Sequence, residues 1–206
     1  MIRSHFPIRL SRRVLAVTAA TGVAAAMGLT AAAVASAAPA SHGHKFSFAL
    51  VPSAGITKCL PHAGGRVTIT TGSLNDTMKI SVHGMPHNAG FDLFVIQQPT
   101  KPFGVAWYQT DVNAGRRGSG TATVRGVFDS ETFSVSPGGT ATFGPTHQYH
   151  LGLWFSNPKT PFKLGCEAGA SAPVVTPFNG EQHAGIQVLN TSEFPASKGP
   201  LAHVHR

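Results

Sequence analysis

Apolar and polar residues alternate along most of the chain from residue 45 onward. Phe46, Phe48 and Leu50 alternate with smaller residues, and the same period of two recurs in residues 67–70 and 77–83. Such alternation is typical of a β-strand that buries one face. Residues 93–96 are apolar at every position, which predicts a central strand that is covered on both faces.

Further runs of the same kind predict strands in residues 105–109, 120–128, 132–136, 140–143, 149–155 and 186–189. No segment of comparable length has the three-four spacing of an amphipathic helix. Short strands joined by Gly, Pro, Asn and Asp turns predict an all-β fold, an antiparallel β-sandwich of the immunoglobulin-like or jelly-roll type. We expect one domain over residues 45–201, with flexible ends at 38–44 and 202–206.

Residues 1–37 have the pattern of a cleaved signal peptide. Four arginines and no acid precede the uncharged run 14–34, and Ala35-Ser36-Ala37 supplies the small residues of a cleavage site. The run is rich in Ala, Gly and Thr, which favours cleavage over a retained membrane anchor. Arg12-Arg13 resembles part of a twin-arginine signal, but Ala16 departs from that motif, so the ordinary secretory route is favoured. The sequence therefore predicts a secreted, extracellular protein with no stable membrane span after cleavage.

The leader changes the meaning of the net charge of +8. It holds four of the sixteen basic residues, so twelve Lys and Arg face eight Asp and Glu in the remainder. These twelve are spread along the chain, whereas nucleic-acid binding calls for a clustered stripe. We therefore expect no nucleic-acid partner. Arg116-Arg117 lies between glycines in a predicted hairpin tip, which is typical of a solvated turn.

Two cysteines, Cys59 and Cys166, are present. In an exported protein such a pair predicts one disulfide. Metal ligation by these thiols is disfavoured, because neither cysteine has a second one at zinc-site spacing.

Catalytic motifs are missing from the sequence. It contains no nucleophile elbow, no metalloprotease His-Glu pattern, no phosphate-binding loop and no dinucleotide fingerprint. The one close pair of acids, Asp129 and Glu131, follows a predicted strand, where turn residues are expected. The sequence thus favours a protein that is not an enzyme.

Histidine raises the alternative of a metal site. His83 and His87 flank one turn, and His147 and His150 precede another predicted strand. Imidazoles at neighbouring strand ends can hold zinc or copper, so these four residues form the candidate metal set. The competing interpretation is that they are ordinary polar turn residues.

Aromatic residues give a second candidate surface. Alternation in residues 149–155 places Trp154 on the face opposite Tyr149, and Trp107 and Tyr108 point to opposite faces of their strand. Exposed rings at Trp107, Tyr108 and Trp154 could stack on sugars or anchor a protein partner. The alternative is that both tryptophans fill the core.

The Ala-rich leader, the Gly/Thr-rich strands, the cysteine pair and the segment 176–191 together look like exported proteins of unassigned function from high-GC Gram-positive bacteria. The resemblance covers most of the mature chain and implies an exported β domain without a catalytic motif. We therefore expect a secreted, disulfide-bridged binding or envelope-associated module without catalytic activity, whose partner is a cell-wall polysaccharide or an extracellular protein. The alternative is a metal-binding protein or metal-dependent enzyme that uses the strand-end histidines.

Overall fold

The computed structural model describes residues 43–128, 133–135, 141–143, 148–178 and 183–204. The predicted signal peptide lies outside these residues, as does His147. The described chain is all-β, as predicted, with one short helix and two single-turn 3₁₀ helices. Its elements are β1 (Lys45–Pro52), η1 (Ile56–Lys58), β2 (Gly64–Thr70), β3 (Asp76–His83), β4 (Gly90–Ile96), β5 (Ala106–Asn113), β6 (Gly120–Gly126), β7 (Phe133–Val135), β8 (Ala141–Phe143), β9 (His150–Phe155), α1 (Lys159–Lys163), β10 (Gln187–Asn190) and η2 (Pro200–His203).

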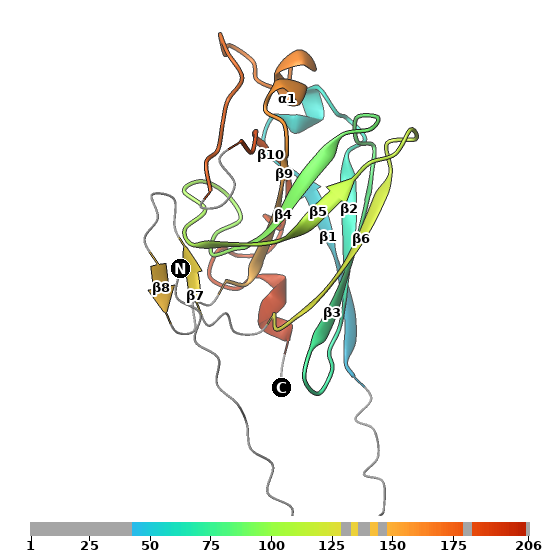
Figure 1. The fold of residues 1–206 in the computed structure, drawn as a ribbon, viewed down its shortest axis with the longest axis vertical. Helices are drawn as coiled ribbons and strands as arrows, with labels where there is room; N and C mark the ends of the chain where they lie inside the picture. Colours follow the sequence, from blue (N-terminus) through green and yellow to red (C-terminus); the bar gives the residue numbers. More distant parts are fainter. Residues whose placement is uncertain (1–42, 129–132, 136–140, 144–147, 179–182, 205–206) are drawn as a thin grey trace, which may run out of the picture. The chain divides into compact units, whose positions relative to one another are not determined.

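The strands form one antiparallel sheet in the order β6-β3-β2-β1-β10-β9-β4-β5-β7-β8 (Figure 1). Its two halves meet where β1 pairs with β10, and this seam consists of only two residue pairs, Val51 with Asn190 and Pro52 with Leu189. By contrast, β1 pairs with β2 over six positions. β10, which lies near the end of the chain, pairs with β1 on one side and with β9 on the other. It therefore joins the half β6-β3-β2-β1 to the half that contains β9, β4 and β5.

Alternation places the main core between the two halves. On β3, Met78, Ile80 and Val82 are buried while the residues between them are exposed or half-buried. They share one apolar cluster with Leu93 of β4 and Leu153 of β9. Burial of apolar surface from both halves is the dominant favourable term in holding them together.

Strands β4 and β9 are buried on their second face as well. There a separate cluster gathers Phe94, Trp154 and neighbouring residues beneath Phe103 of the β4–β5 connection and Phe178 of the segment before β10. This second layer explains why residues 93–96 are apolar throughout.

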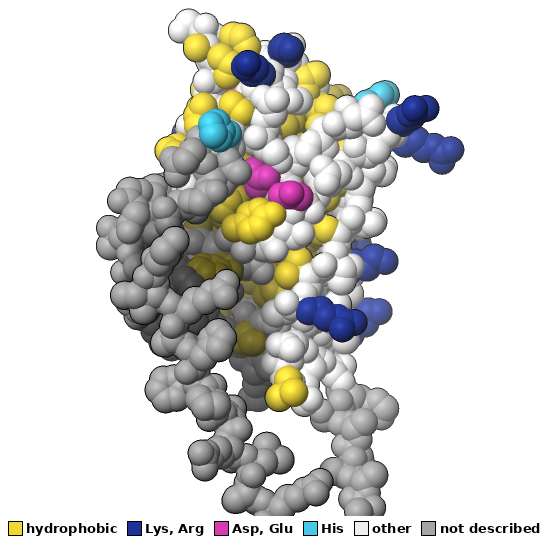
Figure 2. All heavy atoms as spheres, in the orientation of Figure 1, with side chains coloured by type: hydrophobic (Ala, Val, Ile, Leu, Met, Phe, Trp, Pro, Cys, Tyr) yellow, Lys and Arg dark blue, Asp and Glu magenta, His cyan; other side chains and the backbone are white. Residues whose placement is uncertain are grey.

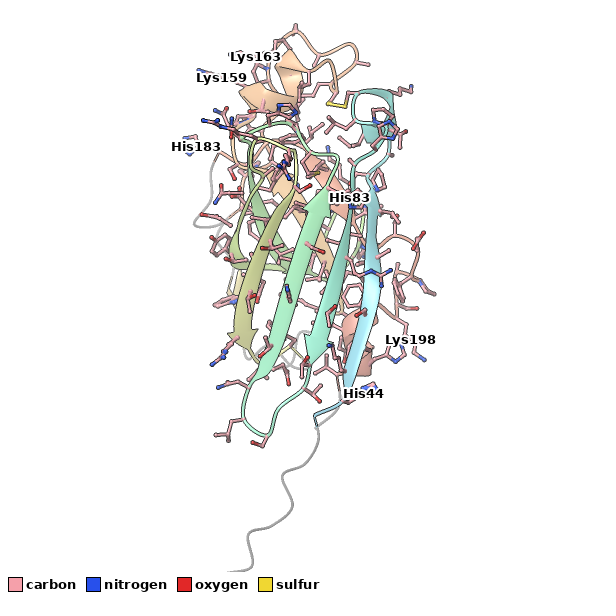
Figure 3. The ribbon with its side chains drawn as sticks, turned by 90° about the vertical axis from the view of Figure 1, so that its right-hand side faces the viewer. His44, His83, Lys159, Lys163, His183 and Lys198 are labelled. Carbon is pink, nitrogen blue, oxygen red and sulfur yellow. A yellow bond between two sulfur atoms is a disulfide. The ribbon has the colours of Figure 1, made fainter. Side chains whose placement is uncertain are left out.

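The disulfide between Cys59 and Cys166 is confirmed (Figure 3). It joins the segment after η1 to the loop after α1, across a sequence separation of 107 residues. Near the domain boundary predicted at residue 201, η2 continues to His203, and both Leu201 and Val204 are buried in the main core. An apolar pair spaced by three residues in a single helical turn was too short a pattern to reveal this packing.

Candidate ligand-binding cleft

A cleft of about 540 Å³ opens beside the disulfide. Four segments build it: the residues that follow β1, the β4–β5 connection, the loop after α1, and the chain entering β10. The lining residues are Ser53, Ala54, Thr100, Lys101, Phe103, Cys166, Glu167, Ala168, Ala170, Val174, Thr176, Ile186, Gln187 and Asn190. A largely apolar wall with a few converging polar groups, in this range of volume, is typical of small-molecule sites.

The polar groups in the cleft are fixed by one another. Ser53 Oγ donates to Gln187 Oε1 over 2.9 Å, and Asn190 Nδ2 donates to both Gln187 Oε1 (2.9 Å) and Ser53 Oγ (3.2 Å). Gln187 Nε2 donates to the Pro99 carbonyl over 3.1 Å. All three side chains are buried, with exposed fractions of 8 % for Ser53, 9 % for Gln187 and 1 % for Asn190. Buried amides bonded in this way have one orientation each, so the cleft is organised before any ligand arrives.

A shift of register in β10 puts Gln187 and Asn190 together. The pairing of β10 with β9 is irregular between Gln187 and Leu189. In a regular strand, residues three apart point to opposite faces, but one extra residue at a bulge reverses this relation. Val188 and Leu189 can then both enter the main core while the two amides meet on the other side. Ser53 joins them because its backbone N–H donates to the Val188 carbonyl over 3.0 Å, which prolongs the seam beyond β1.

Among the residues that the structure describes, Glu167 is the only one that brings a carboxylate to the cleft lining. Its Oε2 accepts from the backbone N–H of Val174 over 2.9 Å, while its Oε1 is covered and has no hydrogen-bond partner among the described residues. A buried oxygen without a donor costs about 1–3 kcal/mol. The side chain as a whole is half-buried and forms part of the cleft lining.

The predicted aromatic residues do not form one exposed surface. Trp154 is completely buried, with its ring centroid 5.0 Å from that of Phe103 and 4.9 Å from that of Phe178. Trp107 is half-buried against the main core. Tyr108 is 45 % exposed, and its hydroxyl donates to Asp111 Oδ1 over 2.7 Å. Trp154 nevertheless supports the cleft wall, because its ring packs against that of Phe103, and Phe103 lines the cleft.

The structure separates the three predicted metal ligands that it describes. His83 and His87 are exposed near the start of β4, whereas His150 pairs with Ile96 at its end. The seven residues of β4 span roughly 20 Å between them. No group of three or more His, Cys, Asp or Glu side chains that could hold a metal lies within the described ranges. Zinc or copper binding through a set that includes His147 stays a prediction.

His150 is engaged inside the protein. Its Nε2 lies 3.1 Å and 3.2 Å from the carbonyls of Pro195 and Ala196, and its Nδ1 lies 2.9 Å from Thr191 Oγ1. Carbonyls only accept, so Nε2 carries the proton and Nδ1 accepts from the threonine hydroxyl. Burial lowers the pKa of His150 below its ordinary value, although the contacts with Ala196, Pro195 and Thr191 oppose this shift. The ring is thus held neutral near pH 7.

Sequence reasoning missed Ser53, Gln187, Asn190 and Glu167. The one signal available was the pair of amides in the otherwise apolar run 186–190. A buried amide in a strand requires a partner, but the sequence does not say which segment provides it.

A comparison of the chain with models of known protein families, with curated proteins and with solved structures finds no match. In the part of the chain that the structure describes, no helix has the length and apolar character needed to cross a membrane.

Proposed function

We propose that the protein is an exported binding module without catalytic activity and that its ligand occupies the cleft beside the disulfide. The observation that carries this proposal is the buried network of Ser53, Gln187 and Asn190, which orders polar groups in the cleft. The disulfide supports export, because such bonds persist in oxidising compartments. In this proposal residues 1–37 are removed as a signal peptide, and the folded sheet is a sandwich of the immunoglobulin-like or jelly-roll kind.

The lining favours a small ligand that carries several hydroxyl groups. Thr100 and Thr176 offer hydroxyls on the walls, Glu167 offers an acceptor, and Phe103 and Ile186 offer apolar surface. One or two sugar units of a cell-wall polysaccharide combine these properties, because a sugar ring presents hydroxyls at its edge and C–H groups on its faces. A chain end or short branch fits a cleft of this volume.

The test is a titration with N-acetylglucosamine, glucose, galactose, arabinose and their disaccharides, followed by amide NMR shifts and calorimetry. We expect one equivalent of at least one sugar to bind and to shift the amide signals of residues 167–176 and 186–190. If no sugar in the panel binds at millimolar concentration, the sugar proposal is wrong.

A matched pair of variants locates the site. Ala168 and Ala172 are both exposed residues of the loop that follows α1, but only Ala168 lines the cleft. Ala168→Trp should fill the cleft and abolish binding, whereas Ala172→Trp should bind as the unmodified protein does. Equal binding by the two variants would place the ligand elsewhere.

A further inference from the structure

The outward-facing side of β6, β3, β2 and β1 carries basic and hydroxyl side chains, and we name it the basic face. Figure 2 shows Lys and Arg side chains projecting from the right-hand edge of the molecule, and Figure 3 turns this edge toward the viewer, with the four strands side by side. Four cations occupy outward positions on these strands: Lys45, Arg66, Lys79 and Arg125. The hydroxyls beside them are those of Ser47, Thr68, Thr70, Thr77, Ser81, Thr121 and Thr123.

Strand register arranges three of these cations in a line. Lys79 of β3 is the partner of Thr123 on β6 and of Thr68 on β2. Arg125 lies two residues from Thr123, and Arg66 lies two residues from Thr68. Such diagonal neighbours are about 7–8 Å apart. Because β6 and β2 both run antiparallel to β3, Arg125 is displaced toward one end of β3 and Arg66 toward the other. The three residues form a diagonal track across the basic face.

No carboxylate interrupts the track. None of the outward positions on the four strands is Asp or Glu. The one acid of these strands, Asp76, is buried, and its carboxylate oxygens accept from the backbone N–H groups of Gly72 (3.3 Å) and Phe128 (3.2 Å). The positive charges of the track are therefore not neutralised by acids on their own face, so the track attracts anions.

We propose that the basic face binds a linear polyanion in which phosphodiester groups link three-carbon polyol units. Phosphate oxygens accept from Arg, Lys, Ser and Thr side chains, which are the donors present here. Successive phosphorus atoms of such a polymer are separated by six bonds. An extended chain advances by roughly 1.2 Å per bond, so six bonds span about 7 Å. This distance matches the spacing between neighbouring cations of the track.

The composition of the basic face separates this partner from other anionic macromolecules. Binding of single-stranded nucleic acid relies on several large aromatic rings that stack on successive bases, whereas the outward positions beside the track carry no Phe, Tyr or Trp and one imidazole, that of His83. Insertion into a lipid surface relies on large apolar side chains, and these positions carry none. The proposal is independent of the proposed function of the cleft, because the two sites share no residue.

The test uses poly(glycerol phosphate) of defined length with the full mature chain, and it measures affinity against salt concentration. Three phosphate contacts predict that log K falls by about 2 for each tenfold rise in salt, at about 0.7 per contact. Arg66→Gln with Arg125→Gln removes two contacts, so the slope should fall by about 1.4 and affinity at 0.1 M salt should drop about 25-fold.

Arg116→Gln with Arg117→Gln is the matched control. It removes the same charge from two exposed arginines in the turn between β5 and β6, outside the track. This control should leave the slope within about 0.5 of the unmodified protein. An equal loss in both variants would mean that net charge alone attracts the polymer and would overturn the proposal. Stronger binding to single-stranded DNA, to polygalacturonate or to vesicles of anionic lipid would also overturn it. Sugar titration of the same variants reports on the cleft separately.

Discussion

Removal of the disulfide should cost this domain several kcal/mol of stability. On the chain-entropy model, a cross-link restricts the unfolded state by about 2.1 + 1.5R ln n cal/mol/K, where n is the number of residues in the loop. The separation of 107 residues between Cys59 and Cys166 gives about 4.8 kcal/mol at 25 °C. Domains are typically stable by about 5–15 kcal/mol, so the loss would remove between about a third and nearly all of the stability of a domain in this range.

Replacement of the two cysteines by serine should change the packing energy of the folded state only slightly. Both cysteines are half-buried, and serine differs from cysteine by one atom. We therefore expect Cys59→Ser with Cys166→Ser to lose roughly 3–5 kcal/mol, below or at the entropic figure because native-state strain subtracts from it. The reduced unmodified protein should behave in the same way, since it keeps the side chains and lacks only the cross-link.

Urea unfolding followed by tryptophan fluorescence measures this loss, because Trp154 is fully buried and Trp107 half-buried in the folded state. The m-value should rise in the reduced protein, whose unfolded chain exposes more surface. A loss below about 1 kcal/mol in both the double variant and the reduced protein would refute the reasoning, because the cross-link would then restrict almost nothing. Cys166 also lines the cleft, so reduction should weaken binding of a cleft ligand.

Three further changes test the packing. In Gly152→Ala the new Cβ would lie closer than 3.0 Å to two ring carbons of Trp154, so we expect a loss of about 1–3 kcal/mol in urea unfolding, against less than about 0.5 kcal/mol for Gly115→Ala. Because the pKa of His150 is lowered in the folded state, the neutral ring contributes its full stabilisation above the unfolded-state pKa of about 6.5. The free energy of unfolding should decline, by at most about 1.4 kcal/mol per pH unit, as the pH falls from there toward the folded-state pKa. His150→Gln should flatten this dependence between about pH 5 and 7. Ser53→Ala leaves one hydrogen of the Asn190 amide without an acceptor. A thermal-shift series should show a loss of stability equivalent to about 1–3 kcal/mol. No loss would mean that a water molecule replaces the serine hydroxyl.

The strands were predictable because their signal is local. Alternation in residues 46–50, 67–70 and 77–83 depends only on which side chains face the core, and the structure places a strand at each. The apolar run 93–96 correctly indicated a strand covered on both faces. The disulfide was predictable for a different reason: a single pair of cysteines has one partner each.

The cleft was not predictable, because its residues come together through long-range pairing. Ser53 and Asn190 are separated by 137 positions, and their contact depends on the seam between β1 and β10. The meeting of Gln187 and Asn190 depends on a register shift in β10 whose position no local pattern marks. The tryptophans illustrate the same limit, since alternation placed Trp154 on the second face of β9 but could not show that Phe103 and Phe178 cover it.

The seam also explains why the cleft lies where it does. Only two residue pairs join β1 to β10, so few backbone hydrogen bonds connect the two halves of the sheet. Side-chain hydrogen bonds from Ser53, Gln187 and Asn190 cross that junction and connect the end of β1 with β10. The same polar network, which joins β1 to β10, also lines the cleft at one edge of the junction. Polar groups retained for closure of the fold can thereby serve as the recognition groups of a binding site.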